Sequence, residues 1–471
     1  MTDSSRLAAL PRGPRESPAL QTARWLMRPL AFLESCRRRF GGTFTVRFVG
    51  HRTPLVMISD PVAIRALYSE RENRLTPGRA VALGPLLGSR SILLQEGTEH
   101  LQRRRLMLPP FHGQRMRAYE DLVAEIAEDE LDRCPVGQPF ALHPHLQHAT
   151  LEVILKAVFG VSEPQRSARL RRLLPRLLDA ASRGVPLRRL VRRARDAGPL
   201  PALGALRDEI DRELFAEISE RRRDPAVPDR QDILSLLIGA RFEDGSTMDD
   251  HELRDQLMTL LIAGHDTTAT ALAWTFDLLL RNPAALARLI AEVDQADDDD
   301  NYLRAVIAEA LRLRPVVPFS SRRIASELRA DGFVLPQGTD VYPATWLTHT
   351  RPDLYPRPFA FRPERFLEKA PTTYGWIPFG GGVHRCLGAA FAEMEMRVML
   401  RSALRTRTLT AASAHPERPI WRGATVSPQH GTRITISPRS EPPPARRHPP
   451  LLEHNHPAPD RTHKEGRSCR A

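Results

Sequence analysis

The stretch PFGGGVHRCLGAAFAEMEMRVML, residues 378–400, places a single cysteine between a run of glycines and a helical pattern. Gly380–Gly382 cannot belong to a stable helix, because glycine loses more backbone entropy on folding than other residues. From Leu387 onward, apolar residues with interleaved glutamates predict a helix. Cys386 therefore lies at or just before a helix N-terminus, where free N–H groups and the helix dipole lower the pKa of a thiol. Such a cysteine is a nucleophile or a metal ligand; the alternative is a small buried residue that only packs.

Composition sets the broad class of protein. The chain has 471 residues, of which 41% are hydrophobic, so it can bury a large core. The four cysteines are widely spaced and form no CxxC pair, which argues against a disulfide framework or a zinc site and favours a reducing, cytoplasmic setting. The net charge of +13 comes almost entirely from arginines spread along the chain. Without a helix-turn-helix, zinc or aromatic-platform motif, we do not expect nucleic-acid binding.

The chain divides into three expected segments. Residues 1–39 form an N-terminal segment, broken by prolines, with no apolar run long enough for a signal peptide or a membrane span. Residues 40–437 form one domain in which helical patterns dominate from about residue 50 to 315, with β-like runs near both ends (TFTVRF, PLVMIS, FVLPQGTDVYPA and RITIS). Residues 438–471, rich in Pro, His and Arg, are expected to be disordered. The expected fold class is mainly α with a small β region (α+β), and we expect a monomer.

One long helix is predicted over residues 248–283, capped by Asp249 or Asp250 and ended by Asn282-Pro283. At 1.5 Å per residue it would span about 45 Å, the width of a whole domain. Its middle, AGHDTT (263–268), contains weak helix formers whose side chains compete for backbone bonds. Such a run marks either a local opening of the hydrogen-bond ladder at a functional site or a helix that simply tolerates its threonines.

Five further residues attract attention by their spacing. Glu309 and Arg312 are three apart in a helical pattern and therefore share a face, and Arg365 stands in a proline-bounded turn upstream of the glycine loop. His100 and Arg104 share the face of another helix at i and i+4. Each pair on its own is as compatible with a solvated surface as with a site.

Together these segments resemble the cytochrome P-450 superfamily of haem-thiolate monooxygenases. The loop from Phe379 to Gly388 fits the family's haem-binding pattern, F-x-x-G-x-(R or H)-x-C-x-G, at every fixed position. AGHDTT fits its oxygen-activation motif, and Glu309-x-x-Arg312 followed by Arg365 fits its structural triad. The resemblance covers roughly residues 40–437 and is closest to bacterial, actinobacterial members. It implies a single domain with a long central helix over the haem.

The resemblance implies a role for each motif residue. Cys386 is the axial thiolate ligand of the iron in haem b, which donates electron density that helps to cleave O–O. The glycine loop lets the backbone approach the porphyrin, with Phe379 packed beside the sulfur and Gly380 and Gly388 within the same loop. The propionates are expected to contact His100, Arg104, His384 and one arginine of the pair Arg322-Arg323, of which the spacing favours Arg323. Because many relatives carry arginine where this chain has His384, that contact is expected to be weaker and pH-dependent.

The helix motif implies a proton path. O2 would bind beside Ala263 and Gly264, whose small side chains leave room, and Thr267 would hydrogen-bond the oxygen while Asp266 relays protons from solvent. The resulting reaction is insertion of one oxygen atom into a C–H or C=C bond of a lipophilic substrate. Residues 79–94 and 316–319 are expected to line its apolar pocket.

No reductase sequence is fused to the chain, so the expected electron donors are a ferredoxin and a ferredoxin reductase. Arg103, Arg105, Arg115 and Arg385 are expected to present positive charge to the ferredoxin. Two alternatives remain at the sequence level: a peroxide-driven peroxygenase, and a non-catalytic haem-binding sensor or carrier. The acid–alcohol pair Asp266-Thr267 argues against both.

Overall fold

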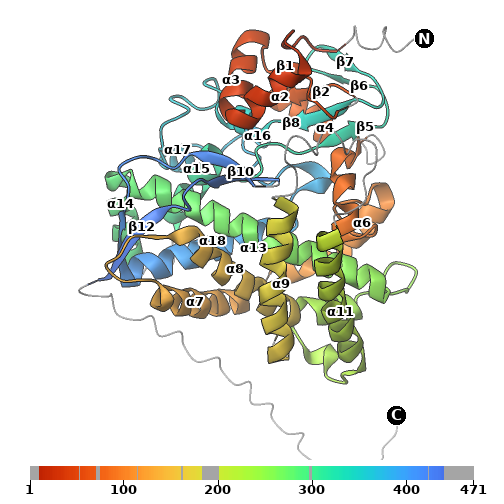
Figure 1. Ribbon diagram of the computed structural model, residues 1–471, viewed down its shortest axis with the longest axis vertical. Helices are drawn as coiled ribbons and strands as arrows, with labels where there is room; N and C mark the ends of the chain where they lie inside the picture. The colour runs from red at the N-terminus through yellow and green to blue at the C-terminus, as the bar shows by residue number, and fades with distance from the viewer. Residues whose placement is uncertain are drawn as a thin grey trace, which may run out of the picture.

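Helix α13, Asp250–Leu280, crosses the computed structural model, and other helices pack around it (Figure 1). The structure describes residues 10–439 except 52, 70–74, 114, 161–162, 183–200, 296–299 and 423. The Asp249 carboxylate caps α13 by accepting from the Glu252 N–H, as one of the two predicted caps requires. The hydrogen-bond ladder is continuous through AGHDTT, where the hydroxyls of Thr267 and Thr268 donate to carbonyls four residues earlier. The threonines are therefore accommodated without a local opening.

The remaining helices account for most of the fold, in agreement with the predicted class. Helices α7, α8 and α18 lie on one side of α13, with α9 and α11 crossing in front of it in the view of Figure 1. The chain folds this way because these helices bury their apolar faces in one continuous core. The helices are α2 Pro18–Met27, α3 Pro29–Phe40, α4 Pro61–Ser69, α5 Gly84–Leu87, α6 Gly97–Met107, α7 Arg115–Arg133, α8 Leu142–Phe159, α9 Pro164–Ser182, α11 Pro201–Arg223, α12 Ile233–Gly239, α14 Pro283–Asp294, α15 Asn301–Leu313, α16 Thr345–His349, α17 Arg365–Glu368 and α18 Ala389–Thr406, and 3-10 turns cover Gly78–Leu83, Pro109–Phe111, Val227–Asp229 and Gly382–His384.

The β structure forms small sheets from distant segments, as predicted. A five-stranded sheet has the order β1-β2-β8-β5-β3, in which only β2 and β8 run parallel. Every β-like run of the sequence is found in a strand, whereas β3 to β6 and β9 to β11 were not predicted. The strands are β1 Thr43–Val46, β2 Leu55–Ile58, β3 Leu75–Thr76, β4 Phe140–Ala141, β5 Arg322–Ile324, β6 Leu328–Ala330, β7 Phe333–Leu335, β8 Asp340–Pro343, β9 Arg407–Ala411, β10 Pro419–Arg422, β11 Thr425–Pro428 and β12 Arg433–Pro438.

Both expected domain boundaries can be compared with the packing. Helix α3 buries Phe32, Leu33 and Cys36 against the five-stranded sheet, and the Thr45 N–H donates to the Arg12 carbonyl (3.1 Å). The described part of segment 1–39 is thus packed on the domain. The expected disorder of residues 438–471 falls almost wholly outside the described residues, which end at 439. Among the described residues, no helix has both the length and the apolar character that a bilayer span requires.

Candidate functional site

The glycine loop takes its shape from a tyrosine far away in the sequence. Gly380 and Gly382 have positive φ values of 70° and 59°, which residues with side chains rarely adopt. A Cβ on Gly382 would lie 2.6 Å from the Tyr68 carbonyl oxygen, and one on Gly381 would lie 2.9 Å from the Tyr68 ring. These glycines therefore permit a close approach to helix α4, and the approach to a porphyrin expected from the motif stays a prediction.

Cys386 follows this loop, two residues before the N-cap of α18. Its N–H donates to the Phe379 carbonyl (2.8 Å), which fixes the turn and places Phe379 close to it in space. Cys386 is an exposed residue, and its sulfur lies near the Gly388 N–H, Arg104 and Arg385. Burial raises the pKa of the Cys386 thiol, against the opposing effects of the Gly388 N–H, Arg104 and Arg385. The helix N-terminus was expected to lower this pKa, and burial outweighs it.

Four basic side chains converge beside Cys386 from three separate elements. His100 and Arg104 come from α6, His384 from the glycine loop, and Arg322 from β5. The rings of His100 and His384 are 4.2 Å apart between centroids. Burial, together with the neighbouring arginines, lowers the pKa of His100 to about 4 and that of His384 to about 3. The cluster contains no carboxylate, so it is a site for an anion.

Arg322, and not Arg323, belongs to this cluster. The Nε atom of Arg322 is buried and has no hydrogen-bond partner among the residues that the structure describes, which is costly unless a ligand supplies one. Arg323, whose side chain is 47% exposed, instead donates from Nε to Asp340 (2.7 Å). Neighbouring residues of a strand point to opposite faces, so only one of the two can reach His100 and His384. The sequence-based preference for Arg323 is therefore not supported by the geometry.

The middle of α13 presents the expected acid and alcohol, each with its own partner. The Thr267 hydroxyl donates to the Ala263 carbonyl (2.7 Å). Asp266 accepts from the side-chain amide of Gln147 on α8 (2.7 Å). Gly264 faces the same helix, since a Cβ there would lie 3.0 Å from the Ile154 side chain. Gly264 therefore serves the packing of α8 against α13, while Ala263 retains accessible surface.

Two polar residues near this motif were missed by the sequence reasoning. Gln147 gave no signal, because a glutamine in a helix is normally a surface residue. Glu395 was treated as one of the glutamates interleaved along α18, yet it is buried, and burial raises its pKa well above the usual range. Among the described residues its Oε1 has no hydrogen-bond partner, and the neighbouring Thr268 opposes the effect of burial on the pKa of this carboxyl. A glutamate amid apolar residues on the inner face of a helix is the signal that could have found it.

The triad is assembled as the sequence suggested, and it is buried. Arg312 donates from Nε and Nη2 to the two oxygens of Glu309 (2.7 and 2.9 Å), and neither side chain is exposed. Arg365 adds a further bond to Glu309 (3.1 Å). Arg312 also donates to the His349 carbonyl, and His349 accepts from the Ile377 N–H just before the glycine loop. The triad thus connects α15 to the segment that carries Cys386.

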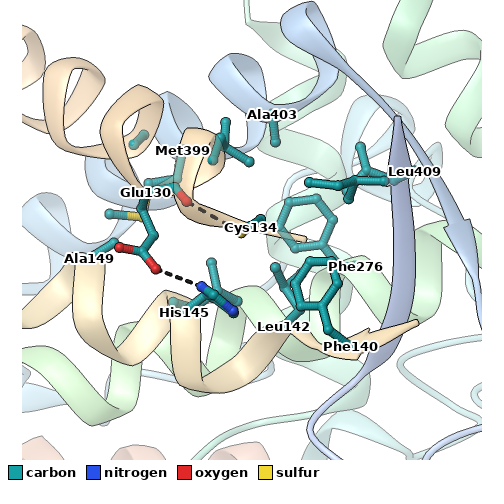
Figure 2. Close-up of a pocket in the computed structure, with 14 residues that line it drawn as sticks. Glu130, Cys134, Phe140, Leu142, His145, Ala149, Phe276, Met399, Ala403 and Leu409 are labelled. Atoms are coloured by element: carbon teal, nitrogen blue, oxygen red, sulfur yellow. Dashed lines mark hydrogen bonds and ion pairs between the residues drawn. The ribbon is translucent and has the colours of Figure 1, made fainter. Parts of the chain in front are cut away.

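A cavity elsewhere does not compete with this site. It lies between α7, α8, α18 and β9, is lined mostly by apolar side chains, and has Glu130, Cys134 and His145 on its wall (Figure 2). Its volume of about 30 Å³ is far too small for an organic substrate. Glu130 accepts from His145 (2.7 Å) across the gap between α7 and α8, so its groups hold two helices together.

The residues around Cys386 fit the haem that the resemblance implies. An orphaned buried Nε on Arg322 and a cluster of bases without a carboxylate suit two propionates. No atom lies within 4 Å of a Cβ position on Gly388, so the loop is open on that side. Among the described residues, no three His, Cys, Asp or Glu side chains gather into a metal site.

Comparisons with known proteins agree with this geometry. A cytochrome P-450 family model matches residues 11–435. The chain is 41% identical over 440 residues to the protein named cytochrome P-450 135B1 of Mycobacterium bovis, covering 91% of each chain, and 38% identical over 405 residues to cytochrome P-450 137 of Mycobacterium tuberculosis, covering 85% and 84%. The solved structure of retinoic acid-bound cyanobacterial CYP120A1 superimposes with a TM-score of 0.79 at 25% identity, covering 91% of this chain and 99% of the other. This chain belongs to the cytochrome P-450 family.

Proposed function

We propose that this haem monooxygenase oxidises a lipophilic small molecule, with Cys386 as the thiolate ligand of the iron and electrons from a separate redox protein. The observation that carries the proposal is the anion site beside Cys386, with the unpartnered Nε of Arg322 at its centre. When bound there, haem supplies the activation of O2 at its iron. His100, Arg104, Arg322 and His384 would hold the propionates.

The chain's own residues would control charge and protons around that chemistry. The Gly388 N–H and the guanidinium of Arg104 stabilise the charged form of the Cys386 sulfur. Phe379, whose carbonyl accepts from the Cys386 N–H, packs edge-on against Trp376 (6.2 Å between centroids) and would shield the sulfur from water. Thr267, beside Ala263, is placed to donate a hydrogen bond at the reacting oxygen. Asp266 would receive protons from solvent and pass them to Thr267.

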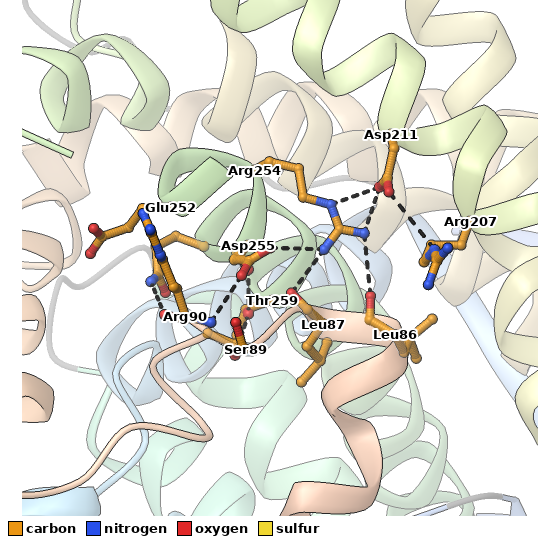
Figure 3. Close-up of polar contacts among 12 residues, drawn as sticks. Leu86, Leu87, Ser89, Arg90, Arg207, Asp211, Glu252, Arg254, Asp255 and Thr259 are labelled. Atoms are coloured by element: carbon orange, nitrogen blue, oxygen red, sulfur yellow. Dashed lines mark hydrogen bonds and ion pairs between the residues drawn. The ribbon is translucent and has the colours of Figure 1, made fainter. Parts of the chain in front are cut away.

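Segment 84–92, which we expect to form part of the wall of the substrate pocket, is hydrogen-bonded to α13. Arg254 on α13 donates to Asp211 of α11 (2.7 Å) and to the carbonyl of Leu87 at the end of α5 (3.0 Å), as Figure 3 shows. Asp255 accepts from the Arg90 N–H (2.9 Å). Segment 84–92 is thus fastened to the helix that carries Asp266 and Thr267. Leu86, Leu87 and Ile92 of this segment are buried apolar side chains.

The electron donor would dock on the face near Cys386. Arg385 is exposed next to the cysteine, and Arg105 is exposed on α6 in an ion pair with Glu243. Arg103 is less suited than the sequence suggested, because its Nε lies 2.8 Å from the buried Glu252 and its side chain is only 14% exposed. Arg385 and Arg105 are therefore the better candidates for contact with an acidic ferredoxin.

One set of measurements tests this proposal. Spectral titration with a library of lipophilic compounds, starting from retinoic acid because the related cyanobacterial protein binds it, would select a substrate. Turnover is then compared with ferredoxin, ferredoxin reductase and NADPH, and with hydrogen peroxide alone. Turnover with ferredoxin supports a monooxygenase, turnover with peroxide only would identify a peroxygenase, and no turnover under either condition would indicate a sensor or carrier.

The anion site has a direct test of its own. Arg322→Ala should lose haem during gel filtration, while Arg323→Ala, the matched control one residue away, should retain it because its guanidinium pairs with Asp340. Equal haem retention by both variants would contradict the assignment of Arg322.

A further inference from the structure

Helix α8 meets α13 along a polar seam inside an otherwise apolar interface. His143, Gln147 and Thr150 follow one another at intervals of four and three residues, so they share one face of α8. His143 bonds the Thr270 hydroxyl (3.0 Å), and Thr150 donates to the His265 carbonyl (2.9 Å). Gln147, between them, donates to Asp266. All three contacts fall within residues 265–270 of α13, around the acid–alcohol pair.

Gln147 is the group that orients Asp266. Among the described residues, no arginine, lysine or histidine forms an ion pair with the Asp266 carboxylate, although ion pairs are abundant elsewhere in this arginine-rich chain. The two histidines nearby do not replace one, because burial lowers the pKa of His143 to about 4 and also lowers that of His265. The amide N–H of Gln147, at 2.7 Å from Oδ1, is therefore the principal fixed contact of this carboxylate.

The side-chain amide of Gln147 can position the Asp266 carboxylate and still release it when it has to move. Asp266 and Thr267 do not bond each other here, since Thr267 donates to Ala263 and Asp266 is held on the α8 side. To deliver a proton to Thr267, the Asp266 side chain must break its hydrogen bond to Gln147 on α8 and turn toward Thr267. A hydrogen bond from a neutral amide restrains the carboxylate less than an ion pair with a guanidinium would, and it still returns the carboxylate to one starting position.

We infer that Gln147 is a positioning residue for the proton relay, holding Asp266 at α8 between proton uptake and transfer to Thr267. This inference rests on the proposed role of Asp266 and adds its holder on a second helix. The alternative is a purely structural role, in which the polar contacts of His143, Gln147 and Thr150 only fix the register between α8 and α13. In that case Gln147 and Thr150 would be equivalent, because each makes one bond across the same interface.

The test uses the haem-loaded full chain and compares two ways of driving turnover of the lipophilic compound selected above. O2 arrives without protons, whereas hydrogen peroxide brings both protons with its oxygen atoms. Gln147→Leu should therefore lower the ratio of ferredoxin-driven to peroxide-driven turnover about ten-fold, a fraction of the 10²–10⁴-fold that proton transfer by a side chain is typically worth. Gln147→Glu, which keeps the volume but cannot donate when ionised, should lower it as well.

Thr150→Val is the matched control, because it removes a seam bond without touching Asp266, and its ratio should equal that of the wild type. Crystal structures supply a readout independent of turnover. The Asp266 side chain should turn away from α8 in Gln147→Leu and keep its position beside α8 in Thr150→Val. Asp266→Asn tests the proton relay separately from the positioning role of Gln147. If it lowers the ratio and both Gln147 variants do not, Gln147 is only structural and the inference is wrong. If Asp266→Asn itself leaves the ratio unchanged, the relay is wrong and the inference falls with it.

Discussion

Replacing Glu309 by glutamine should destabilise the protein severely, because this carboxylate neutralises two buried guanidiniums. It accepts from Nε and Nη2 of Arg312, from Nε of Arg365 (3.1 Å) and from the Arg362 backbone N–H (2.8 Å). Both Glu309 and Arg312 are 0% exposed, so water cannot replace the lost charge. Glutamine keeps the shape and removes the charge, and its amide group would point donors at donors.

The expected magnitude follows from the burial of the pair. Breaking a buried ion pair by removing one partner costs about 3–5 kcal/mol, because the other charge stays buried without compensation. The total stability of a domain is about 5–15 kcal/mol, so the loss is a large part of it. Arg365, itself only 8% exposed, loses its partner too, which places the expected cost at the upper end of that range.

Urea unfolding followed by tryptophan fluorescence measures this loss. The indole N–H of Trp376 donates to the Ala308 carbonyl beside Glu309, so it reports on the affected region. Glu368→Gln is the matched control, since Glu368 pairs with Arg362 nearby but is 55% exposed, and an exposed pair contributes about 0–1 kcal/mol. If Glu309→Gln unfolds within 1 kcal/mol of the Glu368→Gln control at the same slope, the argument from burial is refuted.

Three further outcomes are expected. Cys386→Ser should abolish the red-shifted Soret band of the ferrous carbonyl complex, whereas Cys134→Ser, at a buried cysteine away from the site, should keep it; an unchanged spectrum in Cys386→Ser would exclude this ligand. The haem-free protein should lose stability as the pH falls from about 6.5 toward 4, because the unfolded chain takes up protons on histidines whose pKa values are lowered in the fold to about 4 (His100) and about 3 (His384). His384→Gln should reduce that slope by up to about 1.4 kcal/mol per pH unit, measured as the urea midpoint against pH, and an unchanged slope would show that His384 is not buried in the neutral form. Arg385→Glu should slow reduction by an acidic ferredoxin at low salt and flatten its salt dependence in stopped-flow measurements. Arg433→Glu, at an exposed arginine on β12, is the control, and equal rates in both would place the docking face elsewhere.

Most of the fold could be predicted because local sequence patterns determine where its helices and strands form. The periodicity of residues 248–283 gave α13 to within three residues at each end, and a carboxylate cap and an Asn-Pro break are signals carried by the local sequence. The four β-like runs became strands because alternating or continuous apolar residues suit a buried sheet. Strands β3 and β5 were missed because they are two and three residues long and are held in place by their neighbours in the sheet, not by their own composition.

The prediction of site residues succeeded in choosing candidates where a motif specifies them. It failed where contacts between distant segments determine which way a side chain points. Arg322 and Arg323 are equivalent in composition, and only the pairing of β5 with β8 turns one toward His384 and the other toward Asp340. The glycine loop owes its conformation to Tyr68, which is more than 300 residues earlier in the chain. The pKa of the Cys386 thiol was expected to follow its helix terminus, but burial depends on everything packed around it and acts in the opposite direction. Gln147 could not be predicted for the same reason. Its neighbours in the sequence do not distinguish it from a surface glutamine, and its proposed role follows only from the Asp266 carboxylate 2.7 Å away. The motif therefore predicts which residues would meet the cofactor and oxygen, and the tertiary contacts determine how each of them is held.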